Sequence, residues 1–351
     1  MKKLTIKDVA RAAGVSTTVV SKVINAPRRP DGTLDCPDTS RETAERVLKV
    51  VNELNYRPSR FAAGLRRGKR YVLGVITPDI SNTAFSEGCR VIEDLAHKDG
   101  YTVMFGSSAE NPQKMAELLD TFVANGVDGL IVIPCDACEE SLRKVVSYRI
   151  PVVLSSRDIP SLEGVGRVFQ DNRESIRQVI AHLISNGYSK IAMISENMNV
   201  SSLKDREISY RENMLAAGLE PMMWHADTPT LATQVAEFVK EAVALGTEAI
   251  IAPRMNITLS VLRTIKDLKL RIPEQIALVG HDESPLFTFY NPTISYISQT
   301  SDEVGRESYQ MLQSMIAGNA PGTVLIAPEI CFGESTARRK QLNDFVCCFE
   351  N

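Results

Sequence analysis

The sequence predicts an all-α helix-turn-helix segment at the N-terminus, followed by a larger α/β body built on parallel sheets. The first observation is charge: residues 1–70 hold 16 Lys and Arg against 7 Asp and Glu, whereas the remainder holds 24 against 36. The second is hydrophobic spacing, which changes from helical repeats before residue 57 to short apolar strands separated by helical stretches after residue 71. The alternation of strands and helices is typical of parallel sheets.

Length and charge limit the kinds of protein this chain can be. Its 351 residues suit two or three domains. The net charge of −3 conceals a basic N-terminal segment on an acidic body, which indicates a polyanion partner at one end of the chain. The start M-K-K-L-T-I-K-D lacks the apolar stretch of a secretory signal, and no stretch has the length of a membrane span. We therefore expect a cytoplasmic, nucleoid-associated protein with no membrane partner.

Cysteine usage agrees with that location. Seven scattered cysteines, an odd number, fit reduced thiols in a cytosol. Cys135 and Cys138 form a lone C-x-x-C. A metal or redox role would need further ligands or a thioredoxin-like context, so we interpret the pair as incidental thiols near a strand end and predict no metal site and no cofactor.

The first two helices are predicted from their end signals. Thr5 begins T-I-K-D, a capping-box pattern in which Asp8 replaces the usual Glu, and Gly14 ends this helix. Ser16 begins a second helix after a gap of a few residues, which is helix-turn-helix spacing. The polar side of the second helix carries short hydroxyl side chains and one lysine that can bond phosphates or base edges. These residues are Ser16, Thr17, Thr18, Ser21 and Lys22.

A third helix and a basic linker complete this segment. Ser40 is a cap residue before an amphipathic run, and Pro58 ends the third helix. A three-helix bundle that packs on another domain would show similar spacing, but the positive charge favours DNA as the partner. Four basic residues fall between Arg66 and Arg70. Leu65 precedes them and is either a wedge for the minor groove or a linker residue that packs on the next domain.

These motifs closely resemble the LacI family of bacterial repressors. The resemblance runs through T-I-K-D-V-A-R-A-A-G-V-S, V-S-K-V-I-N, L-N-Y-R-P and L-R-R-G. It continues through L-G-V-I-T-P-D-I-S-N, V-D-G-L-I-V, I-P-V-V-L, H-L-I-S-N-G-Y-S-K-I-A-M-I, L-V-G-H-D-E-S-P and E-S-T-A. Ordered motifs thus cover more than 300 residues.

The resemblance implies a periplasmic-binding-protein-like body of two parallel-sheet lobes. The expected parts are a headpiece over residues 1–57, a hinge helix and linker over 58–70, an effector-binding and dimerisation domain over 71–340, and a tail over 341–351. Within the body, the first lobe is expected at about 71–168 and 300–335, and the second at about 169–299. The crossings between lobes are expected near 165–170, near 296–300 and close to the C-terminus.

The resemblance also implies a mechanism. Two headpieces of a homodimer bind a near-palindromic operator in double-stranded DNA, and the hinge helix enters the minor groove. A small effector bound between the lobes changes their angle and so shifts the equilibrium of DNA binding. The DNA contacts implied are Thr5, Ser16, Thr17, Thr18, Ser21, Lys22, Asn25, Arg28, Tyr56 and Leu65. A loop longer than usual, about residues 26–39, separates the second and third helices.

The effector site implied by the same resemblance lies at the carboxyl ends of the strands, between the lobes. The effector contacts implied are Asn82, Phe85, Arg157, Asp171, Arg206, Arg254, Asp282 and Gln299. Each has an alternative reading: Asp171 and Asp282 can cap helices, and Arg206 can pair with its neighbours. Ala84 replaces one aromatic of the family, and Arg254 with Met255 replaces an Asn-Asp pair.

These departures favour an anionic effector, such as a sugar acid or sugar phosphate, over a plain neutral sugar. The alternative is that Arg254 points to solvent and leaves a weak site. Two other function classes remain: a transport-binding protein shares the two-lobed fold but lacks a basic headpiece, and an enzyme would need a nucleophile-base set that is absent. The C-terminal tail lacks heptads, so we expect a dimer rather than a tetramer.

Overall fold

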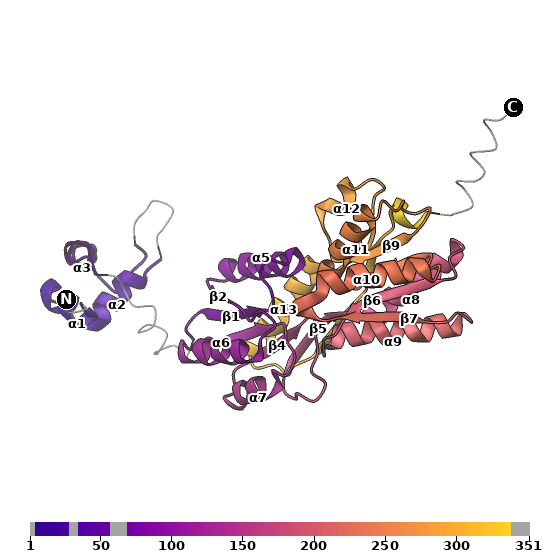
Figure 1. The fold of residues 1–351 in the computed structure, drawn as a ribbon. Helices are drawn as coiled ribbons and strands as arrows, with labels where there is room; N and C mark the ends of the chain where they lie inside the picture. Colours follow the sequence, from indigo (N-terminus) through magenta and orange to yellow (C-terminus); the bar gives the residue numbers. More distant parts are fainter. Residues whose placement is uncertain (1–3, 28–33, 57–68, 338–351) are drawn as a thin grey trace. The chain divides into compact units, whose positions relative to one another are not determined.

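The computed structural model describes residues 4–27, 34–56 and 69–337. The chain divides into two compact units, residues 1–70 and residues 71–351. The ribbon confirms the predicted classes, an all-α headpiece and an α/β body (Figure 1). Most of the predicted hinge and the C-terminal tail lie outside the described residues.

Three helices make up the described part of the N-terminal unit. All three begin where they were predicted to begin, but the third ends at Glu53, before the Pro58 that was expected to end it. They are α1 (Ile6–Ala13), α2 (Thr17–Asn25) and α3 (Arg41–Glu53). The Thr5 N–H donates to Asp8 Oδ2 at 2.9 Å, as the predicted capping box requires. Gly14 follows α1 in left-handed backbone at φ 67°, which glycine adopts without strain. The hydroxyls of Ser16 and Ser40 cap α2 and α3.

The first lobe of the body is a six-stranded sheet in which every pairing is parallel, in the order β11-β5-β4-β3-β1-β2. In that order the strands are Thr323–Ile326, Gly166–Gln170, Val152–Ser155, Gly129–Val132, Val72–Thr77 and Thr102–Ser107. Apolar residues of α6 (Pro112–Ala124) and α7 (Glu139–Ser147) cover one face. The other face is covered by α5 (Thr83–Lys98) and α13 (Ser301–Ile316).

The second lobe is also a six-stranded sheet covered by helices on both faces, in the order β12-β10-β9-β8-β6-β7, and all its pairings except β12 with β10 are parallel. In that order the strands are Glu329–Cys331, Ser295–Ser298, Ala277–His281, Ala249–Ile251, Ile191–Glu196 and Met222–Ala226. α8 (Asn172–Ser185) and α9 (Ser201–Ala216) cover one face. α10 (Leu231–Ala244) and α11 (Met255–Asp267) cover the other, beside the short helix α12 (Pro285–Phe289) and the 3₁₀ turn at Thr228–Thr230.

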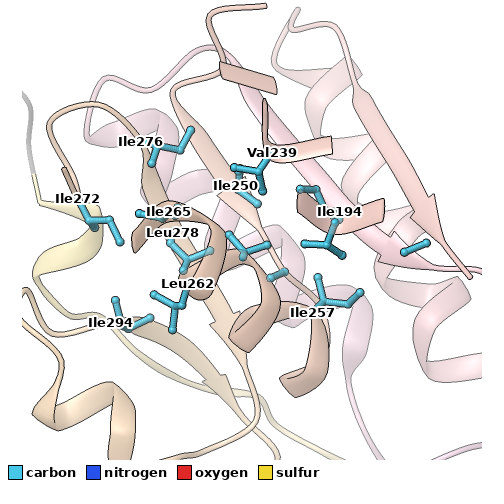
Figure 2. Packing of buried hydrophobic residues seen from close by; sticks show 14 of the residues in the cluster. Ile194, Val239, Ile250, Ile257, Leu262, Ile265, Ile272, Ile276, Leu278 and Ile294 are labelled. Atoms are coloured by element: carbon cyan, nitrogen blue, oxygen red, sulfur yellow. The ribbon is translucent and has the colours of Figure 1, made fainter. Parts of the chain in front are cut away.

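The core between this sheet and α10 and α11 consists of branched aliphatic side chains (Figure 2). Ile194, Ile250 and Leu278 come from three neighbouring strands and are fully buried. They meet Val239 of α10 and Ile257 of α11. Burying each such side chain contributes about 1.5–3 kcal/mol, so the packed sheet gives the loops at its edge a rigid base.

The chain passes between the lobes three times in the described range 71–337: after β5, after β10 and after β11. The first two crossings lie where they were expected. The last falls earlier than expected, because β12 pairs antiparallel with β10 of the second sheet. The following turn at Glu334–Thr336 also belongs there, since the Ser335 N–H donates to Thr293 O at 2.9 Å. Residues 329–336 therefore belong to the second lobe, which corrects the expected range of 300–335 for the first.

No helix in the described part of the chain is long and apolar enough to cross a membrane.

Candidate functional site

In the N-terminal unit, α2 presents a polar surface and buries the opposite side. Val20 and Val23 are fully buried against α1 and α3. The predicted DNA-contact residues Ser16, Thr18, Lys22 and Asn25 are exposed, and Thr17 and Ser21 are half-buried. Side chains of this size and polarity can reach a DNA groove from a helix that a small core holds rigid.

Lys22 and Asn25 on this surface already have protein partners. Lys22 Nζ lies 2.8 Å from Asp38 Oδ2, in the segment that leads into α3. The hydrogen bond to Asp38 raises the pKa of Lys22, so the ammonium keeps its charge at neutral pH. Asn25 donates to Ser21 O at 2.7 Å, within α2.

The remaining predicted DNA-contact residues have different surroundings. Thr5 is exposed at the start of α1, where it forms the capping box. Tyr56 is half-buried and packs against the headpiece core. Arg28 and Leu65 lie outside the described residues, so the predicted minor-groove wedge stays a prediction.

In the body, seven of the eight predicted effector residues line one cavity between the lobes. Its empty space is about 400 Å³, open solvent included. The seven are Asn82, Phe85, Arg157, Arg206, Arg254, Asp282 and Gln299. Asp171 is the exception: it caps α8, with Oδ1 accepting from Glu174 N at 2.9 Å. The cap is the alternative that the sequence offered for Asp171, and its contact with an effector stays a prediction.

Asp282 lines this cavity and accepts hydrogen bonds from both lobes. It follows β9 in left-handed backbone at φ 68°, which aims its carboxylate across the cleft. Oδ2 accepts from Asn82 of the other lobe at 3.3 Å and from Met255 N at 3.3 Å. Oδ1 lies 2.8 Å from His281 Nδ1. Burial alone would raise the pKa of Asp282. The combined effect of His281 and Arg206 is larger and lowers this pKa below its ordinary value, so the carboxylate is ionised.

Arg206 of α9 is the buried cation opposite this carboxylate, with 4% of its surface exposed. Nε donates to Asn172 Oδ1 at 2.8 Å and Nη1 donates to Pro253 O at 2.6 Å, which fixes the guanidinium plane. Burial lowers the pKa of Arg206 to about 9, still above neutral pH, so the group keeps its charge. A fixed cation beside a fixed anion suits a ligand that carries both hydroxyl and acidic groups.

Arg157 and Arg254 enter the cavity from opposite lobes, and each is paired with a carboxylate. Glu110 accepts two hydrogen bonds from Arg157, Nη1 to Oε2 at 2.9 Å and Nη2 to Oε1 at 2.8 Å. Arg254 Nη1 lies 2.5 Å from Glu196 Oε2, and its Nη2 lies 3.5 Å from Glu110 Oε1. Arg254 therefore does not point to solvent.

Three residues of this site were missed at the sequence level. Glu196 ends the buried strand β6, and a charged residue at the carboxyl end of an apolar strand is a signal that could have found it. His281 ends β9 in the same way. Glu110 gives no such signal, because it lies in the turn after β2, a strand that has no fully buried residue.

A second, more open cavity adjoins the first and shares Ser156, Arg157 and Val200 with it. Its empty space is about 1360 Å³, open solvent included. Cys135 and Cys138 lie in its wall as free thiols. The hydrogen bond with Cys135, together with burial, raises the pKa of Cys138 well above its usual value, and the same hydrogen bond lowers the pKa of Cys135. Within the described residues, no group of three or more His, Cys, Asp or Glu is arranged to hold a metal ion.

Comparison with known proteins connects both units to one family. The family model for bacterial regulatory proteins of the lacI family matches residues 5–59, and the model for a periplasmic binding protein-like domain matches residues 180–336. The HTH-type transcriptional regulator KdgR of Bacillus subtilis (strain 168) is 30% identical over 339 residues, which cover 94% of this chain and 97% of that protein. The chain belongs to the LacI family. It is therefore a DNA-binding transcriptional regulator and not an enzyme.

Solved structures of other transcriptional regulators share the fold. The lac repressor dimer bound to operator and the anti-inducer ONPF has a TM-score of 0.79 at 22% identity, covering 96% of this chain and all of that one. The complex of the transcriptional regulator CelR with cellobiose has a TM-score of 0.67 at 22% identity, covering 95% and 99%. At this identity the likeness concerns the fold.

The buried pair of His281 and Asp282 generates a prediction about stability and pH. Burial lowers the pKa of His281 from its ordinary 6.5 to about 4, so the folded protein holds a neutral imidazole while the unfolded chain takes up a proton below pH 6.5. The free energy of unfolding should therefore fall as pH drops from 6.5 to 4, by about 3 kcal/mol from this group.

His281→Phe should make that decline shallower, although it lowers stability at pH 7 by leaving Asp282 Oδ1 without its donor. His97→Phe, at an exposed position of α5, is the matched control and should keep the wild-type slope. Urea unfolding at several pH values measures both. Equal slopes for the wild type and His281→Phe would contradict the prediction.

Proposed function

We propose that this regulator binds a near-palindromic operator in double-stranded DNA as a homodimer and represses transcription. The observation that carries the proposal is the exposed polar surface of α2 in an N-terminal segment, residues 1–70, that has nine more basic than acidic residues. Electrostatic attraction between the basic side chains and the DNA phosphates brings the N-terminal segment to the duplex, and the side chains of α2 can then distinguish bases. Such a protein would act in the cytoplasm, on the nucleoid.

We further propose that a polar, sugar-type effector binds in the cavity between the lobes. Asp282 and Asn82 can accept and donate hydrogen bonds to hydroxyls, and Phe85 offers an aromatic face. CelR, which shares the fold, is solved with cellobiose, and the side chains gathered here suit a ligand of that general class. Because the cavity is lined by both lobes, a ligand that prefers one lobe angle would shift DNA binding.

The homodimer is proposed from exposed apolar side chains on the second lobe. Phe289 of α12 has 84% of its surface exposed, Leu286 has 59%, and Leu259 of the neighbouring α11 has 39%. A large aromatic side chain left in water is uncommon on a monomer and marks an interaction surface. The lac repressor, of the same fold, is solved as a dimer on its operator.

Lys22→Ala should weaken DNA binding about tenfold and reduce the slope of log affinity against log salt by about 1, because one contact to the phosphate backbone or a base edge is lost. Lys49→Ala removes an equal charge from α3, outside the polar surface of α2, and should change the affinity much less. Fluorescence anisotropy on DNA from upstream of the gene measures both. Equal losses in the two variants would remove α2 from the interface, and no salt-dependent binding by the full chain would refute operator binding.

Phe289→Asp should convert the dimer into monomers, since it places a charge where the partner would bury an aromatic ring. Leu215→Asp is a matched control on α9, at a position that is 65% exposed, and should remain dimeric. Size-exclusion chromatography with light scattering gives the mass of each. A monomeric wild type, or a dimeric Phe289→Asp, would contradict this assignment of the interface.

A further inference from the structure

An ion-pair chain runs through the cleft from one lobe to the other, and Glu110 is its central member. Glu110 lies between β2 and α6 of the first lobe, and its side chain is 23% exposed. Its carboxylate accepts two hydrogen bonds from Arg157 of the same lobe, and its Oε1 lies 3.5 Å from Arg254 Nη2 of the second lobe. One carboxylate therefore satisfies two guanidinium groups that come from opposite sides.

Both arginines keep their positions through contacts other than Glu110. Arg157 Nη1 also donates to Pro134 O at 2.8 Å, and the guanidinium lies 5.9 Å from the centre of the Phe85 ring. Arg254 also pairs with Glu196, which is 2% exposed and accepts from Asn256 Nδ2 at 3.0 Å. The two guanidinium groups thus form a prepared site for an anion, with or without Glu110 in place.

The backbone around Glu110 has hydrogen bonds of its own, since the Asn111 N–H donates to Ser108 O at 3.0 Å and closes the turn. Ala109 and Glu110 have φ values of 53° and 55°, a left-handed backbone that side-chain-bearing residues adopt rarely. The next helix begins independently of this carboxylate, because Asn111 Oδ1 accepts from Lys114 N at 2.9 Å. Release of the Glu110 carboxylate would therefore leave both this turn and the cap of α6 in place.

We propose that Glu110 holds, in the ligand-free chain, the place of the effector's own anionic group, and that a carboxylate or phosphate on the effector displaces it. The inference rests on the effector site proposed above and narrows its ligand to acidic sugars, which are sugar acids or sugar phosphates. Glu110 joins the lobes through Arg157 and Arg254. When the ligand displaces it, the ligand's anionic group contacts the two arginines instead and joins the lobes in its place. Binding and lobe angle are coupled by this exchange.

The test uses minimal probes, so it does not depend on knowing the natural effector. Thermal unfolding of the full chain is followed in sodium acetate, sodium phosphate or acetamide, with chloride keeping the ionic strength constant. In Glu110→Gln the competing carboxylate is gone, so the apparent affinity for acetate or phosphate should be at least tenfold higher than in the wild type. Acetamide, the neutral counterpart of acetate, should give no difference. The anion with the larger effect shows whether a carboxylate or a phosphate is preferred.

Asp136→Ala is the matched control. Asp136 also joins the lobes, because its Oδ1 accepts from Asn199 Nδ2 at 3.0 Å, and it contacts neither arginine in the hydrogen bonds described here. This variant should respond to anions as the wild type does. An equal gain in Asp136→Ala would show that loosening the lobes, rather than removing the competitor, explains the result and would overturn the proposal.

A double variant, Glu110→Gln with Arg254→Gln, locates the anion. The higher apparent affinity for acetate or phosphate should disappear when Arg254 is replaced. If that higher affinity persists, the anion binds elsewhere and the proposed site is contradicted. An equal response of the wild type and Glu110→Gln to both anions would refute the displacement. The measurement contains no DNA, so its failure leaves the operator proposal standing, and absence of operator binding would leave this test unaffected.

Discussion

The charged side chains between the two lobes must neutralise one another, and this requirement organises the body of the protein. An isolated buried charge is costly, whereas a buried pair with satisfied hydrogen bonds is tolerated. Arg206 is buried by α9 and faces the Asp282 carboxylate, which burial alone would disfavour in its ionised form. Arg157 and Arg254, which line the same cavity, form ion pairs with Glu110 and Glu196. Three arginines and three carboxylates of this network thus balance.

The balance depends on both lobes, because each supplies partners to the other. Asn82 caps α5 of the first lobe and also donates to Asp282 of the second. Gln170 and Ser298, at the ends of two crossing strands, are joined by a 2.6 Å hydrogen bond. A change at the ligand is therefore transmitted through contacts that already connect the lobes, without a separate pathway.

Much of the architecture could be predicted because it depends on local signals. Gly14, Ser16 and Ser40 mark helix ends through backbone geometry and capping, and the structure places the ends at those residues. Repeated apolar strands predict parallel sheets, since buried strands of this kind carry helices on both faces. The antiparallel β12 was missed because a strand of three residues has too little pattern to reveal which lobe it joins.

The cavity could be predicted only in part, for a physical reason. Side chains that follow buried strands converge at the edge of a sheet, so Arg157 and Asp282 could be grouped from the sequence. Asp171 also follows a strand, but its carboxylate turns to cap the next helix. Glu110 follows no simple rule, because a residue in left-handed loop backbone is aimed by ion pairs with residues 47 and 144 positions away.

A crystal structure of the full chain grown in phosphate at neutral pH tests the central claim most directly. The account predicts a phosphate ion between the Arg157 and Arg254 guanidinium groups, with the Glu110 carboxylate withdrawn from both and Asp282 still bound to His281. The account would be contradicted by a structure in which Glu110 keeps both hydrogen bonds to Arg157 while phosphate occupies another part of the cleft or is absent from it.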